Sequence, residues 1–155
     1  MPDGLFPPLQ FPVTPRLKWQ SRDGKYYFWD PRRKKYILLT PEEWVRQHVI
    51  AWLESEAYPP ELIAVERQLT INRQPKRFDV VVFDRRNRPF LLTECKRPDV
   101  RINEKTLMQA LQYNRALKAP YLLLTNGRDH YLWAVMPDRE AVALTKLPRF
   151  EEYPR

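Results

Sequence analysis

Glycine is scarce in this chain, and its scarcity excludes two kinds of nucleotide site. The 155 residues include three glycines, at positions 4, 24 and 127. A phosphate-binding GxxxxGK[ST] loop and a GxGxxG dinucleotide fingerprint both need glycines at close, fixed spacings. Neither motif can be written with these positions. We therefore expect no P-loop motor and no Rossmann site in this sequence.

Cysteine, histidine and long apolar runs are also scarce. The single cysteine, Cys95, excludes an intramolecular disulfide and fits a reducing cytoplasm. With His48 and His130 as the only histidines, a structural zinc site of the usual kind cannot be built. We expect His48 and Cys95 to point into the core, which leaves no thiol nucleophile. The longest apolar runs are strand-sized and the N-terminus lacks the features of a signal peptide, so we expect a cytoplasmic protein without a membrane segment.

The charge of the chain is strongly positive. Lysine and arginine total 27 against 19 aspartates and glutamates, which gives a formal charge of +8. Such a balance favours a polyanionic partner, either nucleic acid or an anionic membrane surface. The basic clusters lie at residues 32–35, 73–77, 85–88, 96–97 and 101. Each cluster has two interpretations, a phosphate-binding surface or an ordinary solvated turn.

The first 39 residues differ in pattern from the rest. Residues 1–16 contain five prolines and predict an extended, loosely held arm. Aromatic and branched runs at 26–29 and 36–39, separated by a turn at 30–33, predict a β-hairpin. The aromatic residues Trp19 and 26–29 have two interpretations, stacking on bases or packing in the core, and we favour core packing.

The remaining sequence predicts one α/β domain at 40–146, followed by an exposed, charged tail at 147–155. Thr40, Pro41 and Glu43 have the spacing of a helix start with a capping box. Apolar residues then recur at helical spacing up to residue 53. Strands are predicted at 63–71, 78–84 and 90–96, a helix from 103 or 104 to 117, a strand at 121–124, and a further strand, an edge candidate, at 131–135. The expected order of the core is αβββαβ, a mixed central sheet flanked by helices.

The residues most suited to chemistry are Asp79, Glu94 and Lys96. Alternate side chains of a strand share a face, so Glu94 and Lys96 point the same way. The rest of this strand has the composition of a buried strand. Asp79 opens the neighbouring strand of the same hairpin and can reach the same place. Buried charges are costly unless they pair or bind a metal. One interpretation is therefore a catalytic metal site, and the other is a cross-strand salt bridge on a surface hairpin.

Two nearby carboxylates suit a hard divalent cation such as Mg²⁺. A bound cation can polarise a scissile phosphate and lower the pKa of an attacking water. Lys96 can orient or deprotonate that water, or stabilise charge on the phosphoryl group. The backbone carbonyl of Cys95 lies between Glu94 and Lys96 and is a further candidate ligand.

The order of these elements resembles the PD-(D/E)XK nuclease superfamily. More narrowly, residues 40–127 resemble the N-terminal nuclease domain of type I restriction endonuclease R subunits. The stretches that carry this resemblance are PEEWVRQ at 41–47, RFDVV at 77–81, ECKRP at 94–98, QALQYN at 109–114 and LTNG at 124–127. Phe78 stands where the superfamily pattern has proline, so the Pro-Asp pair is relaxed.

The resemblance implies roles for individual residues. It implies that Asp79 and Glu94 bind the metal and that Lys96 is catalytic. A Gln-x-x-x-Tyr motif, matched by Gln109 and Tyr113, would hold DNA phosphate or support the site; the alternative is the polar flank of an amphipathic helix. Family members often add a glutamate from the first helix to the metal shell. Glu43 is the first candidate for that role, although it has a capping function, and Glu42 and Glu66 follow.

The predicted function is a Mg²⁺-dependent DNA endonuclease of restriction or defence type, with Mn²⁺ as a substitute. The alternative is a non-catalytic DNA-binding or accessory subunit of a larger DNA-processing complex. A typical R subunit carries a helicase motor, and this sequence has no P-loop, so we expect separate motor or specificity subunits as partners. A homodimer is compatible with the sequence. The form of the nucleic-acid substrate is left open.

Overall fold

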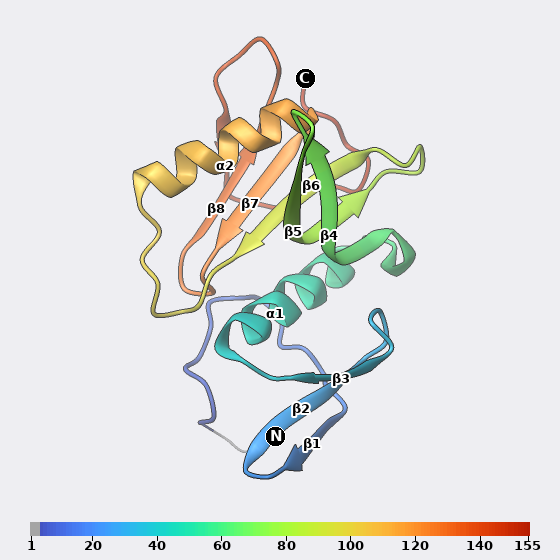
Figure 1. The fold of residues 1–155 in the computed structure, drawn as a ribbon. Helices are drawn as coiled ribbons and strands as arrows, with labels where there is room; N and C mark the ends of the chain where they lie inside the picture. The colour runs from blue at the N-terminus through green and yellow to red at the C-terminus, as the bar shows by residue number, and fades with distance from the viewer. Residues whose placement is uncertain (1–3) are drawn as a thin grey trace.

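The computed structural model describes residues 4–155, which form two sheets and two α-helices (Figure 1). The small N-terminal sheet is antiparallel, in the order β1-β2-β3, and the large sheet is mixed, in the order β4-β5-β6-β7-β8-β9. The small sheet comprises β1 (Trp19–Arg22), β2 (Lys25–Asp30) and β3 (Lys35–Leu38). The helices are α1 (Pro41–Ser55), the short 3-10 helix η1 (Pro60–Leu62) and α2 (Glu104–Leu117). The large sheet comprises β4 (Ile63–Ile71), β5 (Gln74–Phe83), β6 (Pro89–Cys95), β7 (Tyr121–Thr125), β8 (His130–Ala134) and β9 (Val142–Leu144).

The large sheet has the predicted core order. β6 and β7 are parallel and all other neighbours are antiparallel. Parallel strands need a crossover connection, and α2 supplies it between β6 and β7. The αβββαβ prediction is therefore confirmed, from α1 through β7.

The two helices cover opposite faces of the large sheet, and the small sheet lies beyond α1 (Figure 1). Each face has its own apolar cluster. One cluster packs Val45, Val49 and Leu53 of α1 against the sheet. The other packs Ala110 of α2, with Leu107, against the opposite face. The sheet is thus buried on both sides, and α1 has a sheet on each side of it.

The start of α1 has only the Thr40 half of the predicted capping box. The Glu43 carboxylate is bound by Arg46, Arg33 and Gln47, and the Thr40 N–H donates to the Leu38 carbonyl at 3.1 Å. The Thr40 side chain accepts a hydrogen bond from the backbone N–H of Glu43 at 3.1 Å, and Pro41 occupies the first turn. This satisfies one of the free N–H groups at the helix start. No helix among the described residues is both long enough and apolar enough to span a bilayer.

The N-terminal arm is more ordered than predicted. Leu9 and Phe11 pack against the main core, and the Gln10 N–H donates to the Gly127 carbonyl at 2.7 Å. Gly127 has a φ of 86°, and a Cβ there would lie 2.9 Å from the Leu9 side chain. The prediction of a loose arm is therefore wrong at residues 9–11, where apolar side chains pack on the core. Residues 1–3, also part of that prediction, lie outside the described residues.

Two predictions about the C-terminal part need correction. β8 is not an edge strand, because β9 pairs with it through Leu144, Ala143 and Val142. The segment 147–155 is not simply exposed, because Leu147 and Phe150 pack on the main core. The pattern missed both features because β9 is three residues long and the apolar residues of the tail are isolated among charges. The N-terminal hairpin also has one strand more than predicted, β1.

Candidate active site

Asp79 lies at an interruption in the pairing of β4 and β5. The register pairs Val65 with Val80 and Arg67 with Phe78, but Glu66 and Asp79 do not pair. Glu66 has a φ of 50°, which is unusual for a residue with a side chain. Val80 packs in the cluster on the α1 face, whereas Phe78 packs in the cluster on the α2 face. The alternation of β5 therefore breaks at Asp79.

The Asp79 carboxylate is held by two donors. One oxygen accepts a hydrogen bond from the backbone N–H of Cys95 at 2.7 Å. The other accepts from the Arg46 guanidinium at 2.8 Å. This links the break in β5 to the end of β6 and to α1. The Asp79 side chain keeps 21% of its surface exposed. Its position is therefore fixed, but solvent can still reach it.

Arg46 is the centre of a buried ion-pair network on α1. Its guanidinium contacts one Glu43 oxygen at 2.5 Å as well as Asp79, and its side chain is 6% exposed. Burial alone would lower the pKa of Arg46, but the negative charges of Glu43 and Asp79 outweigh it and raise that pKa. Arg46 is therefore a permanent cation between two carboxylates.

The second oxygen of Glu43 is also occupied. It contacts Arg33 of the N-terminal segment at 2.9 Å and accepts a hydrogen bond from Gln47 at 3.1 Å. Arg33 also contacts Asp30 at 2.5 Å. The network therefore runs from the small sheet through Glu43 and Arg46 to the candidate metal ligand. Sequence reasoning missed both arginines; only the three-residue spacing of Glu43 and Arg46 was a signal for one of them.

Glu42, the residue before Glu43 on α1, carries a second carboxylate near Arg46. Burial and the nearby charge of Asp79 raise the pKa of the Glu42 carboxyl, while Arg46 and Lys96 act in the opposite direction. The Glu42 side chain is 43% exposed and lies 3.6 Å from Arg46. The Glu42 carboxyl therefore responds to the charges of Asp79 and Lys96, whereas both Glu43 oxygens are engaged by arginines.

On the other side of the strand ends, Glu94 and Lys96 meet the predicted residues of α2. Both line a polar cavity of about 180 Å³ together with Gln109 and Tyr113. Lys76, Thr106 and Ala110 complete its lining. The predicted alternation of β6 holds, because Leu92 packs on the α2 face and Cys95 on the α1 face. A larger hollow of about 630 Å³ lies beside β9 and the C-terminal segment and contains none of these predicted residues.

Lys76 of β5 is a residue that sequence reasoning did not single out. Its ammonium lies 2.7 Å from Glu94 Oε1, and 5.4 Å from the ring centre of Tyr113. Glu94 Oε1 is buried and has no hydrogen-bond partner, so this contact is an ion pair without hydrogen-bond geometry. The only signal in the sequence was membership of the basic cluster 73–77.

The Cys95 thiol takes no part in this arrangement. It is free and buried, and burial together with the charge of Asp79 raises its pKa well above the ordinary value. A buried, protonated thiol is a poor nucleophile. The backbone continues the strand pairing here, since the Lys96 N–H donates to the Thr125 carbonyl at 2.8 Å.

The donor groups present suit a hard cation. Within residues 4–155, no three side chains of histidine, cysteine, aspartate or glutamate are gathered as a metal site. Magnesium, however, is commonly held by one or two carboxylates with several waters. Asp79 and Glu94 supply two carboxylates beside the end of β6, and one Glu94 oxygen is a buried acceptor without a hydrogen bond.

The remaining residues that the sequence singled out pack within the protein or lie on its surface, outside the polar cavity. His48 is buried as expected, and burial lowers its pKa. Among the hairpin aromatics, Phe28 is fully buried, but Trp19 and Trp29 are 41% and 38% exposed. Core packing therefore holds for only part of that set. Arg32 contacts Glu54 at 2.6 Å, so at least this basic residue is engaged within the protein.

Comparison with known proteins places this sequence in a family. No curated protein matches the sequence. The fold is similar to the crystal structure of a "putative nuclease" belonging to DUF820 from Anabaena variabilis ATCC 29413, with a TM-score of 0.51 and 14% identity over 83% of this chain and 86% of that chain. The sequence pattern of the family described as "Type I restriction enzyme R protein N terminus" matches residues 41–148, which include both helices and the whole large sheet. The chain therefore belongs to the family of type I restriction enzyme R protein N termini.

Proposed function

We propose that this domain hydrolyses phosphodiester bonds in DNA as a metal-dependent endonuclease of restriction type. The observation that carries the proposal is the meeting of Glu94 and Lys96 with Gln109 and Tyr113 in one polar cavity, with Asp79 fixed at the adjoining strand end. Membership of the restriction R family supports it, and so does the fold shared with a protein described as a nuclease.

Each residue has a distinct role in this proposal. Asp79 and Glu94, with the carbonyl of Cys95, would hold Mg²⁺, or Mn²⁺ in its place. The metal would polarise the scissile phosphate and lower the pKa of a water. Lys96 points into the same cavity as Glu94 and would orient that water and stabilise negative charge on the phosphoryl oxygens.

The α2 side of the cavity would hold the DNA backbone. The Gln109 amide and the Tyr113 hydroxyl are hydrogen-bonding groups on one face of α2, and both line the cavity. Lys76 adds a second cation near Glu94. Such contacts position a phosphate without reading base sequence. We further propose that separate motor or specificity subunits deliver the DNA, in keeping with the family.

A second candidate function is DNA binding without cleavage. It is favoured by one observation, that both carboxylates already have cationic partners, Arg46 for Asp79 and Lys76 for Glu94. A site of this kind attracts phosphate through its lysines while its acids remain paired.

Plasmid cleavage separates the two candidates. Supercoiled plasmid and single-stranded DNA are incubated with the protein in Mg²⁺, Mn²⁺ or EDTA, alongside Lys96→Ala and the control Lys146→Ala. Lys146 is exposed and follows β9, three strands away from β6. We expect metal-dependent cleavage that falls at least about 100-fold in Lys96→Ala and is unchanged in Lys146→Ala. DNA binding with no cleavage in either metal would favour the second candidate.

A further inference from the structure

One face of the small N-terminal sheet displays two exposed aromatic rings, Trp29 and Tyr36, next to the partly buried Tyr27. The register pairs Trp29 with Tyr36 and Tyr27 with Leu38, and directly paired residues share a face. Trp29, Tyr36 and Leu38 are each between 37% and 40% exposed. The rings of Trp29 and Tyr36 contact each other edge to face, with centres 5.4 Å apart. Large aromatic side chains exposed together are unusual on a surface without a binding role.

Positive charge accompanies these rings. Arg22 pairs with Lys25 on the same face, and the Arg22 guanidinium lies 6.0 Å from the ring centre of Tyr27. Lys18 accepts a backbone hydrogen bond from Trp29 and so lies beside it across the sheet. By strand alternation, the one acidic residue of β1–β3, Asp30, belongs to the opposite face, where it is 2% exposed and bound to Arg33. β1 and β2 therefore place two cations and no acid on the aromatic face, and Lys18, just before β1, adds a third; Asp23 lies in the turn between the two strands.

We infer that this face, here called the aromatic face (Lys18, Arg22, Lys25, Tyr27, Trp29, Tyr36 and Leu38), binds a single-stranded segment of nucleic acid. Bases stack on exposed aromatic rings, and arginine and lysine neutralise the backbone between them. Tyr27 and Trp29 are two residues apart on one strand, about 7 Å, so each ring can receive a base of its own. A sheet that presents aromatic rings to unpaired bases is an established way of binding single strands.

Charge and ring content together favour a nucleic acid over an acidic peptide. An acidic peptide needs the cations but gains little from three aromatic rings and a leucine. Duplex DNA offers phosphates but keeps its bases stacked on one another. A single strand alone uses both the rings and the cations. The small sheet lies on the far side of α1 from the large sheet, so this contact is separate from the candidate active site (Figure 1).

The test is fluorescence anisotropy with a labelled oligothymidylate of roughly 20 nucleotides, longer than such a face covers. All titrations contain EDTA, so binding is measured whether or not the protein cleaves DNA. The variant is Trp29→Ala and the matched control is Trp19→Ala. Trp19 is 41% exposed but pairs with Phe28 on the opposite face of the same sheet. Trp29→Phe is the conservative variant, and circular dichroism checks the fold of each protein.

We expect Trp29→Ala to weaken binding roughly 10-fold or more, Trp29→Phe to restore most of it, and Trp19→Ala to have little effect. With three cations engaged, the logarithm of affinity should fall with the logarithm of salt with a slope of about −2. Three results would each overturn the proposal. Trp29→Ala could weaken binding of a duplex of the same length by as much as it weakens binding of the single strand. Polyglutamate could displace the oligonucleotide, or Trp19→Ala and Trp29→Ala could weaken binding equally. Failure of plasmid cleavage would leave this result unaffected.

Discussion

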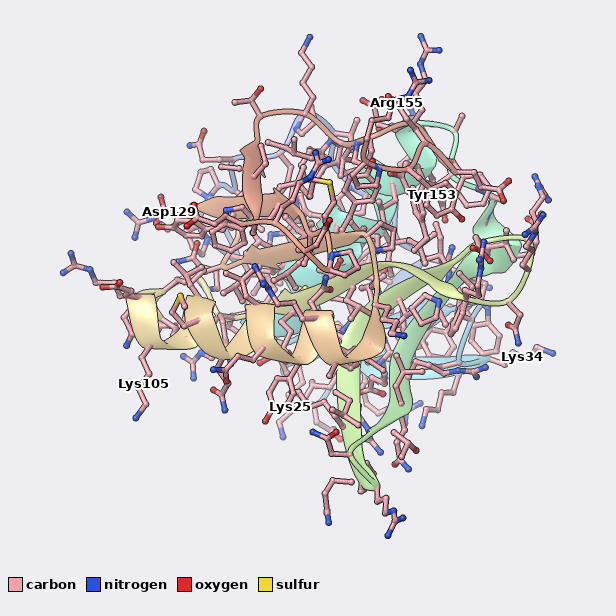
Figure 2. The ribbon with its side chains drawn as sticks, turned by 90° about the horizontal axis from the view of Figure 1, so that it is seen from above. Lys25, Lys34, Lys105, Asp129, Tyr153 and Arg155 are labelled. Atoms are coloured by element: carbon pink, nitrogen blue, oxygen red, sulfur yellow. The ribbon has the colours of Figure 1, made fainter. Side chains whose placement is uncertain are left out.

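The two helices of this domain are built for different tasks. Most of α1 is buried, including the charged or polar residues Glu43, Arg46, Gln47 and His48. In α2, only Ala110 and Asn114 are buried. The reason lies in the layers, because α1 is enclosed between the large sheet and the small sheet, whereas α2 covers one face of the large sheet and borders solvent on its other side (Figures 1 and 2). The candidate active site lies where the two environments meet.

This difference divides the candidate site into a fixed half and an open half. On the α1 side, Asp79 is held by Arg46, which is itself locked between carboxylates. On the α2 side, Glu94 has a single cationic partner, Lys76, whose side chain is 30% exposed. An enclosed arginine cannot leave, but a flexible lysine beside a cavity can. We therefore expect α1 to fix the position of the Asp79 carboxylate. On the α2 side, we expect Glu94 to exchange Lys76 for other ligands.

The largest effect should come from removing the cation of the fixed half. Arg46→Ala leaves the buried Glu43 and the half-buried Asp79 without their shared partner. Breaking a buried pair from one side costs about 3 kcal/mol or more, and Glu43 keeps Arg33 and Gln47, so we expect a loss near 3 kcal/mol in the free energy of unfolding. Urea denaturation followed by circular dichroism measures it.

Lys76→Ala is the matched comparison from the open half. Because Lys76 is partly exposed, its ion pair with Glu94 should contribute less than about 1 kcal/mol. If Arg46→Ala and Lys76→Ala lower the free energy of unfolding equally, the division into a fixed and an open half is wrong.

The next effect concerns metal binding in the open half. The Lys76 ammonium lies 2.7 Å from Glu94 Oε1. A cation ligated by Glu94 would therefore be repelled by the positive charge of Lys76. Lys76→Met keeps the length of the side chain and removes the charge, so we expect Mn²⁺ to bind roughly 10-fold more tightly, a change of about 1.4 kcal/mol. Isothermal titration calorimetry measures the affinity, with Lys105→Met on exposed α2 surface as the control (Figure 2). Unchanged affinity in Lys76→Met would show that Lys76 does not compete with the metal.

Much of the open half could be predicted from the sequence. Strand alternation placed Glu94 and Lys96 on one face, and helical spacing placed Gln109 and Tyr113 on another, and the structure brings all four to one cavity. These relations are local, since each depends on residues within one element. The core order of elements was accessible for the same reason, because periodicity and capping are properties of short segments.

The fixed half could not be predicted in this way. Arg33 and Glu43 lie in different elements, and nothing in their spacing shows that they meet. The break in β5 at Asp79 depends on Glu66 of the neighbouring strand and its positive φ. Packing of the arm on Gly127 is likewise a contact between distant segments. Such contacts depend on how layers stack, which periodicity does not encode.

The smallest effect is a dependence of stability on pH that belongs to the fixed half alone. His48 of α1 is 4% exposed, and burial lowers its pKa from the ordinary value of 6.5. The buried polar residue of α2 is Asn114, which does not titrate. Below pH 6.5 the unfolded chain therefore binds a proton at this position that the folded chain resists. By linkage, the stability that His48 contributes is present above pH 6.5 and is lost as the pH falls through the lowered folded pKa.

His48→Phe keeps a ring beside Trp44 and Phe11, whose ring centres lie 4.4 and 5.3 Å away, and removes the titrating group. It also removes the contact of Nδ1 with the Trp44 carbonyl at 2.8 Å, which shifts stability by an amount that varies little with pH. The readout is therefore the slope and not the level. Between about pH 5 and pH 7, urea denaturation should show a shallower rise of the free energy of unfolding in the variant than in the native protein. Equal slopes would mean that His48 takes up its proton as easily in the fold as in water, and that α1 is less enclosed than its position between two sheets implies.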